Sequence, residues 1–249
     1  NLGAVVGKIF NPDVPATETI ASYWYFAIAL FGAAMTPYEV FFYSSGAVEE
    51  RWSEKDLSLN KVTAYIGFAF GAFLAASAIA VAAQVFKPLG ISVDELSQVA
   101  LGPAKALGTV GLIAFLVGLF ASTFGAALEV SLSTGYSIAQ FFGWTWGKFE
   151  DTKSASRFHL SIIVLVVVAT LTLFTSVDPV KVTEIAVIFS AIALPLTYIP
   201  ILIVSNDREY LGDHANGRVL NAVGSAYLVI VTIAALAAIP LMIWTKMGS

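Results

Sequence analysis

The sequence GAAMTPYE, residues 32–39, lies in the middle of an apolar segment, Tyr23 to Ser45, that is long enough to cross a lipid bilayer. A proline inside a helix removes one backbone hydrogen bond, so Pro37 leaves the carbonyl of Ala33 without its usual donor. In hydrocarbon an unpaired carbonyl is tolerated only where protein, water or a ligand satisfies it. The stretch therefore predicts a membrane helix that is broken near residues 33–38.

Four oxygen donors fall within seven residues at this break: the Ala33 carbonyl, the Thr36 hydroxyl, the Tyr38 phenol and the Glu39 carboxylate. Proline kinks are common structural features of membrane helices, so the kink alone does not indicate a site. A carboxylate at the centre of a membrane helix, however, costs about 2.5 kcal/mol or more. Because oxygen ligands suit hard cations such as Mg²⁺, Ca²⁺ or Mn²⁺, Glu39 favours a metal site over a simple kink.

The composition of the whole chain indicates a polytopic, all-α membrane protein. It is 58% hydrophobic and 12% charged, whereas a typical soluble domain is about 25% charged. This excludes a disordered chain and a coiled coil. The net charge of −4 provides no basic face for nucleic acid, so no nucleic-acid partner is expected. The absence of cysteine excludes thiolate metal sites and cysteine nucleophiles.

Six continuous apolar segments predict about six membrane helices, because about 20 residues are needed to cross the bilayer. They comprise residues 23–45, 62–86, 107–142, 159–174, 180–204 and 220–244. The distribution of Lys and Arg places the loop after the first span in the cytoplasm. Its residues, Val48 to Lys61, have mixed charges and predict a solvated, partly helical loop. Leu2 to Phe10 predict the last turns of an earlier helix, so we expect a C-terminal part of a longer protein, with a missing N-terminal half as its partner.

Two motifs resemble one known family. Residues 32–45, GAAMTPYEVFFYSS, resemble the sixth transmembrane helix of the NRAMP family of divalent-metal transporters, where Gly-Ala and two further residues precede Met-Pro-His-Asn. Residues 194–202, LPLTYIPIL, resemble its tenth helix. The resemblance implies helices six to eleven of a LeuT-like fold with inverted repeats. It places helix one, which bears Asp and Asn metal ligands in the family, outside this sequence.

The departures from the family pattern bear on the transported ion. Thr36 stands where the family has its metal-binding Met, and Glu39 stands where it has Asn. Ala33 is kept, at the position whose backbone carbonyl binds metal in the family. Replacing a soft thioether with a hydroxyl removes a means of preferring Mn²⁺ or Fe²⁺ over Mg²⁺. The pattern thus resembles the NRAMP-related magnesium transporters, which implies transport of Mg²⁺ with Mn²⁺ also carried.

The same comparison bears on proton coupling. Tyr38 replaces the family's His, and tyrosine titrates near pH 10 whereas histidine titrates near neutral pH. Transport by alternating access without proton coupling is therefore expected, in a bacterial plasma membrane and without a resident cofactor. Glu129 lies within the third span, either as a carboxylate that faces the bundle or as part of an ion pathway.

Other functions remain open from the residues alone. A proton-coupled Mn²⁺/Fe²⁺ transporter of the ordinary NRAMP type is the nearest alternative. An amino-acid transporter on the same architecture would need no carboxylate at the break, and a non-transporting scaffold or receptor would need no ion site. An enzyme is the least supported class, because no nucleophile and base fall at a plausible depth.

Overall fold

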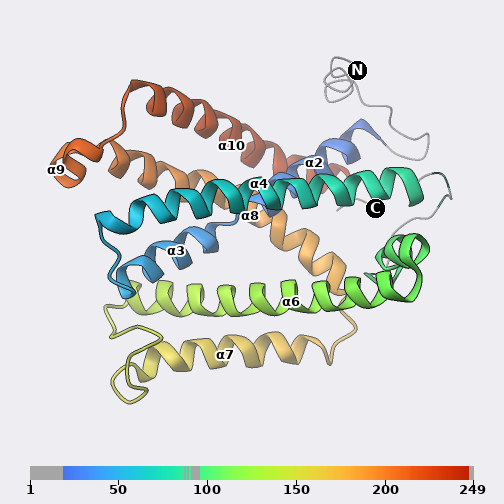
Figure 1. Ribbon diagram of the computed structural model, residues 1–249, viewed down its shortest axis with the longest axis horizontal. Coiled ribbons are helices and arrows are strands. Elements are labelled where there is room, and N and C mark those ends of the chain that lie inside the picture. Colours follow the sequence, from blue (N-terminus) through green and yellow to red (C-terminus); the bar gives the residue numbers. More distant parts are fainter. Residues whose placement is uncertain (1–18, 87, 89, 91–95, 247–249) are drawn as a thin grey trace. The chain divides into compact units, whose positions relative to one another are not determined.

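The computed structural model describes residues 19–86, 88, 90 and 96–246, and every regular element in these residues is a helix (Figure 1). The helical turns predicted for Leu2 to Phe10 lie outside the described residues. Within the described residues, five helical segments are long and apolar enough to cross a membrane: Ile20–Glu49, Glu54–Phe86, Leu101–Phe141, Pro179–Asn206 and Arg218–Trp244. The protein is therefore an integral, polytopic membrane protein.

The sixth predicted span falls short of these five. Helix α7, Ser156–Thr172, has 17 residues, and at 1.5 Å per residue it is about 25 Å long. Its length is at the lower end of the range of about 17–25 residues for a membrane helix, so α7 is a marginal span by length. The sequence prediction treated all six apolar segments alike, because hydropathy marks an apolar run without fixing where its helix ends.

The chain forms two compact units, and the first contains residues up to Val40 together with those from Val177 onward. It comprises α2 (Ile20–Ala34), α8 (Pro179–Asn206), the short α9 (Arg208–Leu211) and α10 (Arg218–Trp244). Helices α2, α8 and α10 contact one another. The buried core residues between these helices are Tyr25, Ile28, Ala29, Ile188, Ala191 and Ala238.

Gly32 allows the closest approach within this first unit. A Cβ atom at this position would lie 2.3 Å from the carbonyl oxygen of Val187 and 2.9 Å from the Cβ of Ala191. Only a residue without a side chain fits there, so α2 rests directly on the backbone of α8. Small residues serve the same purpose at helix contacts in membranes generally. Helix α8 remains continuous although Pro195 and Pro200 lie inside it.

The second unit contains residues 41–176. Its helices are the later part of α3 (Pro37–Glu49), α4 (Leu57–Val81), α5 (Leu96–Val99), α6 (Leu101–Phe141) and α7, with the short helices η1 (Glu54–Asp56) and η2 (Ala82–Phe86). Tyr136 and Phe158, both fully buried, lie in the core between α6 and α7. Gly108, with φ of 62°, interrupts α6 near its start, so its 41 residues are not one straight helix.

Candidate metal site at the helix break

The predicted break lies between α2 and α3 and consists of two residues. Helix α2 ends at Ala34, Met35 is extended with φ of −150° and ψ of 99°, and α3 begins at Pro37. The sequence predicted a helix broken near residues 33–38, and the structure adds that Pro37 opens the second of two separate helices. The reason is that proline, with its fixed φ and no N–H, fits the first position of a helix better than the interior.

The Ala33 carbonyl still lacks its usual backbone donor, as the sequence predicted. Pro37 has no N–H to donate to it, and the last four carbonyls of any helix lack partners within that helix. These carbonyls give the end of α2 a partial negative charge that favours a cation. Glu39 lies in the first turn of α3, next to the positive end of that helix. The carboxyl end of α2 thus suits a bound cation, and the Glu39 carboxylate is placed to counter the positive end of α3.

The four predicted ligand residues differ in how far they are exposed to solvent. Thr36 is 7% exposed, and its hydroxyl oxygen is buried without a hydrogen-bond partner among the described residues. Tyr38 and Glu39 are half-buried, and Ala33 is exposed. A buried hydroxyl that lacks a partner costs about 1–3 kcal/mol. Thr36 is therefore the residue at the break whose environment most calls for an additional ligand.

In the part of the chain that the structure describes, acidic and histidine side chains do not gather elsewhere to form a stronger metal site. Among the described residues, no group of three or more His, Cys, Asp or Glu side chains could hold a metal ion. Glu129 is half-buried in α6, away from the break along the chain. The break residues therefore remain the best metal-site candidate in this part of the protein.

Sequence reasoning missed how Met35 is held at the break. The hydroxyl of Tyr227 on α10 donates a hydrogen bond to the Met35 sulfur at 2.6 Å. The ring of Tyr198 on α8 meets the Tyr227 ring edge to face at 4.9 Å, and the Phe31 ring lies 6.3 Å from it. Met35 and Tyr227 are 192 residues apart in sequence, and no local pattern indicates the contact.

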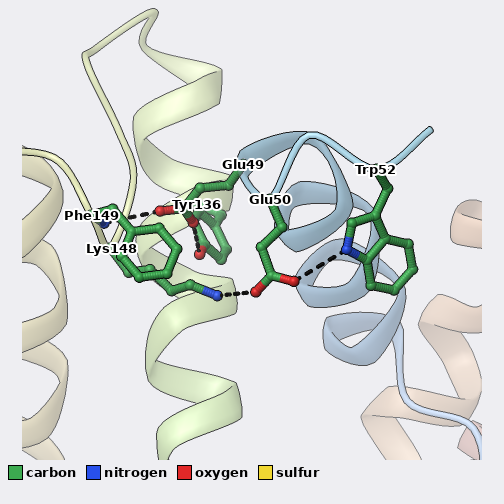
Figure 2. Close-up of polar contacts among 6 residues, drawn as sticks. All are labelled: Glu49, Glu50, Trp52, Tyr136, Lys148 and Phe149. Atoms are coloured by element: carbon green, nitrogen blue, oxygen red, sulfur yellow. Dashed lines mark hydrogen bonds and ion pairs between the residues drawn. The ribbon is translucent and has the colours of Figure 1, made fainter. Parts of the chain in front are cut away.

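A second polar cluster, at the end of α3, was also missed. The sequence analysis assigned Glu49 and Glu50 to a solvated loop, but Glu49 is half-buried. Its carboxylate accepts hydrogen bonds from the Tyr136 hydroxyl on α6 and, at 3.0 Å, from the backbone N–H of Phe149 (Figure 2). The end of α3 is thereby attached to α6 and to the segment that connects α6 with α7.

Glu50 completes this cluster, which we call the Glu49–Glu50 cluster. Its carboxylate forms an ion pair with Lys148 at 2.6 Å and accepts a hydrogen bond from the Trp52 ring N–H at 3.1 Å (Figure 2). The hydrogen bond from Lys148, then that from Trp52, and the charge of Lys148 lower the pKa of Glu50. Two carboxylates at the negative end of a helix are unfavourable by themselves, so these contacts offset an electrostatic cost.

Comparison with known proteins identifies the family. Residues 1–240 match the family model Nramp, described as natural resistance-associated macrophage protein-like. The chain therefore belongs to the Nramp family, which confirms the resemblance drawn from the two motifs.

Two curated relatives have the same name, divalent metal cation transporter MntH. The protein of Pectobacterium carotovorum subsp. carotovorum (strain PC1) is 22% identical over 237 residues, covering 92% of this chain and 53% of the relative. That of Caldanaerobacter subterraneus subsp. tengcongensis is 18% identical over 237 residues, covering 91% of this chain and 52% of the relative. The chain spans about half the length of these relatives.

Proposed function

We propose that this protein transports divalent metal cations across a membrane and that the break between α2 and α3 is part of its ion site. The observation that carries the proposal is the buried, unpartnered hydroxyl of Thr36 within a broken helix of a Nramp-family chain. Glu39, in the first turn of α3, adds a carboxylate three residues after Thr36. The names of the two relatives, both divalent metal cation transporters, support the same substrate class.

Each break residue has a distinct role in this proposal. The Ala33 carbonyl and the Thr36 hydroxyl contribute neutral oxygen ligands, and the Glu39 carboxylate contributes the negative charge. Tyr38 lines the site with its phenol. Because Mg²⁺ takes six oxygen ligands and gives up its waters reluctantly, retained waters and residues outside the break complete its shell.

The ion that fits these ligands best is Mg²⁺, with Mn²⁺ also carried. All four proposed protein ligands are oxygen donors, which suit hard cations, and no thioether is among them. Tyr38 stands where the family has a His, and tyrosine as a residue type does not titrate near neutral pH, so we infer that transport is not coupled to protons. Proton-coupled transport of Mn²⁺ or Fe²⁺, as expected for an ordinary member of the family that the two motifs resemble, is the second candidate function.

The architecture that supports this function is the LeuT-like inverted-repeat fold. In that fold α2 and α3 are the two halves of helix six, α8 is helix ten, and α7, which packs against α6, counts as the sixth spanning helix. Helix one, with the remaining Asp and Asn ligands, then belongs to the N-terminal half. Substrate sites near the bilayer midplane, formed by discontinuous helices, are the rule in such transporters. We place the protein in a bacterial plasma membrane.

The test is metal uptake by the full-length chain in proteoliposomes. Mg²⁺ and Mn²⁺ uptake are compared for the wild type, Glu39→Gln and the control Glu209→Gln, whose carboxylate is exposed on α9. The proposal predicts that Glu39→Gln abolishes most uptake of both ions and that Glu209→Gln leaves it unchanged. An internal pH dye recorded in the same vesicles reports proton coupling.

The contrary outcomes are distinct. Mn²⁺ uptake with Mg²⁺ excluded, or acidification that follows metal entry, would replace this proposal with a proton-coupled Mn²⁺/Fe²⁺ transporter. Full uptake by Glu39→Gln would remove the break from the ion site. No uptake of either ion would favour an amino-acid carrier on the same architecture, which uptake of labelled amino acids would then test.

A further inference from the structure

We propose that Tyr227 determines ion specificity by holding the Met35 sulfur away from the ion site. This inference rests on the proposed function only in assuming that a cation occupies the break. The hold on Met35 is itself a property of the first unit, to which both residues belong. Tyr227 is thus a positioning residue, which acts on the ion through Met35.

The geometry of the break separates Met35 from Thr36. Met35 has extended backbone angles, and a residue that precedes proline, as Thr36 does, is also driven toward extended conformations. Successive side chains of an extended backbone point to opposite sides. One of the two residues can therefore face the ion while the other faces away, and the structure shows which one is held elsewhere.

Met35 is the residue that is held elsewhere. Its sulfur accepts the hydrogen bond of the Tyr227 hydroxyl, and the Tyr227 ring is in turn fixed by the edge-to-face contact with Tyr198. Thr36, by contrast, has a buried hydroxyl without a partner among the described residues. The hydroxyl is thus available to a ligand, while a lone pair of the sulfur is occupied.

The Met35 and Thr36 side chains favour different classes of ion, so the one that faces the break decides which ion binds there. A thioether favours soft metal ions, and a hydroxyl favours hard ions. Methionine has three rotatable side-chain bonds and adapts readily, so only a specific contact keeps its sulfur in one place. Removing the Tyr227 hydroxyl frees the Met35 side chain to turn toward the break, where it would bind a soft cation.

The decisive variant is Tyr227→Phe, which removes the hydroxyl and keeps the ring. Tyr198→Phe is the matched control, because it makes the same change in the neighbouring ring and leaves the Tyr227 hydroxyl in place. The full-length chain is labelled with ¹³C-methyl methionine, and the Met35 signal is assigned by its loss in Met35→Leu. Cd²⁺ serves as the soft probe and Mg²⁺ as the hard one.

In the wild type and in Tyr198→Phe, we expect that Cd²⁺ leaves the Met35 methyl signal in place. In Tyr227→Phe, the signal shifts on Cd²⁺ addition. Residues that orient a ligand typically change metal affinity by about tenfold or more. Because this change frees a thioether that can bind a soft ion, we expect Cd²⁺ to bind about tenfold more tightly. Mg²⁺ binding stays within twofold of the wild type in both variants.

Two results would overturn the inference. A Met35 signal that responds to Cd²⁺ in the wild type would show that the sulfur is already available. An unresponsive signal in Tyr227→Phe would show that the hydroxyl does not hold it. Failure of the proposed function is read separately: if the break binds no cation, Glu39→Gln alters neither Mg²⁺ nor Cd²⁺ binding, whatever the Met35 signal does.

Discussion

Replacing Gly32 with alanine should separate α2 from α8. The added Cβ would lie 2.3 Å from the Val187 carbonyl oxygen and 3.1 Å from the Ala191 backbone nitrogen. Both atoms belong to the backbone of a helix, so neither can rotate away as a flexible side chain would. To restore an ordinary contact of about 3.5 Å, the two helices must move apart by about 1 Å.

The energetic cost follows from this displacement. A gap of about 0.5–1 Å forfeits a quarter to a half of the dispersion energy of the atoms that line it. Overpacking of this kind typically costs about 1–3 kcal/mol. Alanine gains about 0.5–1 kcal/mol over glycine inside a helix, which offsets part of this loss. We expect a net loss of about 1–2 kcal/mol in the free energy of unfolding.

The assay is reversible unfolding of the purified full-length chain in detergent, followed by circular dichroism. Gly46→Ala is the matched control, because Gly46 also lies in a helix and a Cβ there would meet no atom within 4 Å. The control should be as stable as the wild type or slightly more so. Equal stability of Gly32→Ala and Gly46→Ala would refute the close approach of α2 to α8.

Three further predictions concern the Glu49–Glu50 cluster and the break. Tyr136→Phe removes a hydrogen bond to the Glu49 carboxylate and should cost about 1.5–3 kcal/mol of unfolding free energy, measured by the same assay. The lowered pKa of Glu50 means that its ion pair with Lys148 stabilises the fold above the unfolded pKa of about 4.3 and that this stabilisation is lost as the pH falls through the lower folded value. Glu50→Gln should therefore flatten the stability profile below about pH 4.3, and an unchanged acid profile would contradict this. Mg²⁺ at about 100 times its Kd should stabilise the wild type by about 2.7 kcal/mol, and chelation with EDTA or the change Glu39→Gln should abolish this gain.

Local sequence patterns predicted the helical class and the position of the break. Continuous apolar runs mark membrane helices reliably, because the bilayer requires both apolarity and internal hydrogen bonding. The same patterns could not show that Pro37 opens a new helix, since a proline kink and a proline at the first helical position look alike in sequence. Nor could hydropathy show that α7 is shorter than a typical span.

The contacts between distant residues were beyond local reasoning. The Tyr136 hydroxyl donates a hydrogen bond to the Glu49 carboxylate, although the two residues are 87 positions apart in sequence. Glu49 is therefore half-buried, whereas the sequence predicted that it lies in a solvated loop. Likewise, nothing in the sequence around Met35 indicates its hydrogen bond with Tyr227. Both cases depend on tertiary packing, which neither helical periodicity nor composition encodes.

The two-residue length of the break has an evolutionary consequence. Because successive side chains of an extended backbone point to opposite sides, exchanging Met35 and Thr36 would present the sulfur where the hydroxyl now lies. Such an exchange alters neither chain length, amino-acid composition nor mean hydropathy. On the proposed function, a transporter lineage could thus move between hard and soft cargo through a transposition of neighbouring residues, a change that comparisons of composition would not detect.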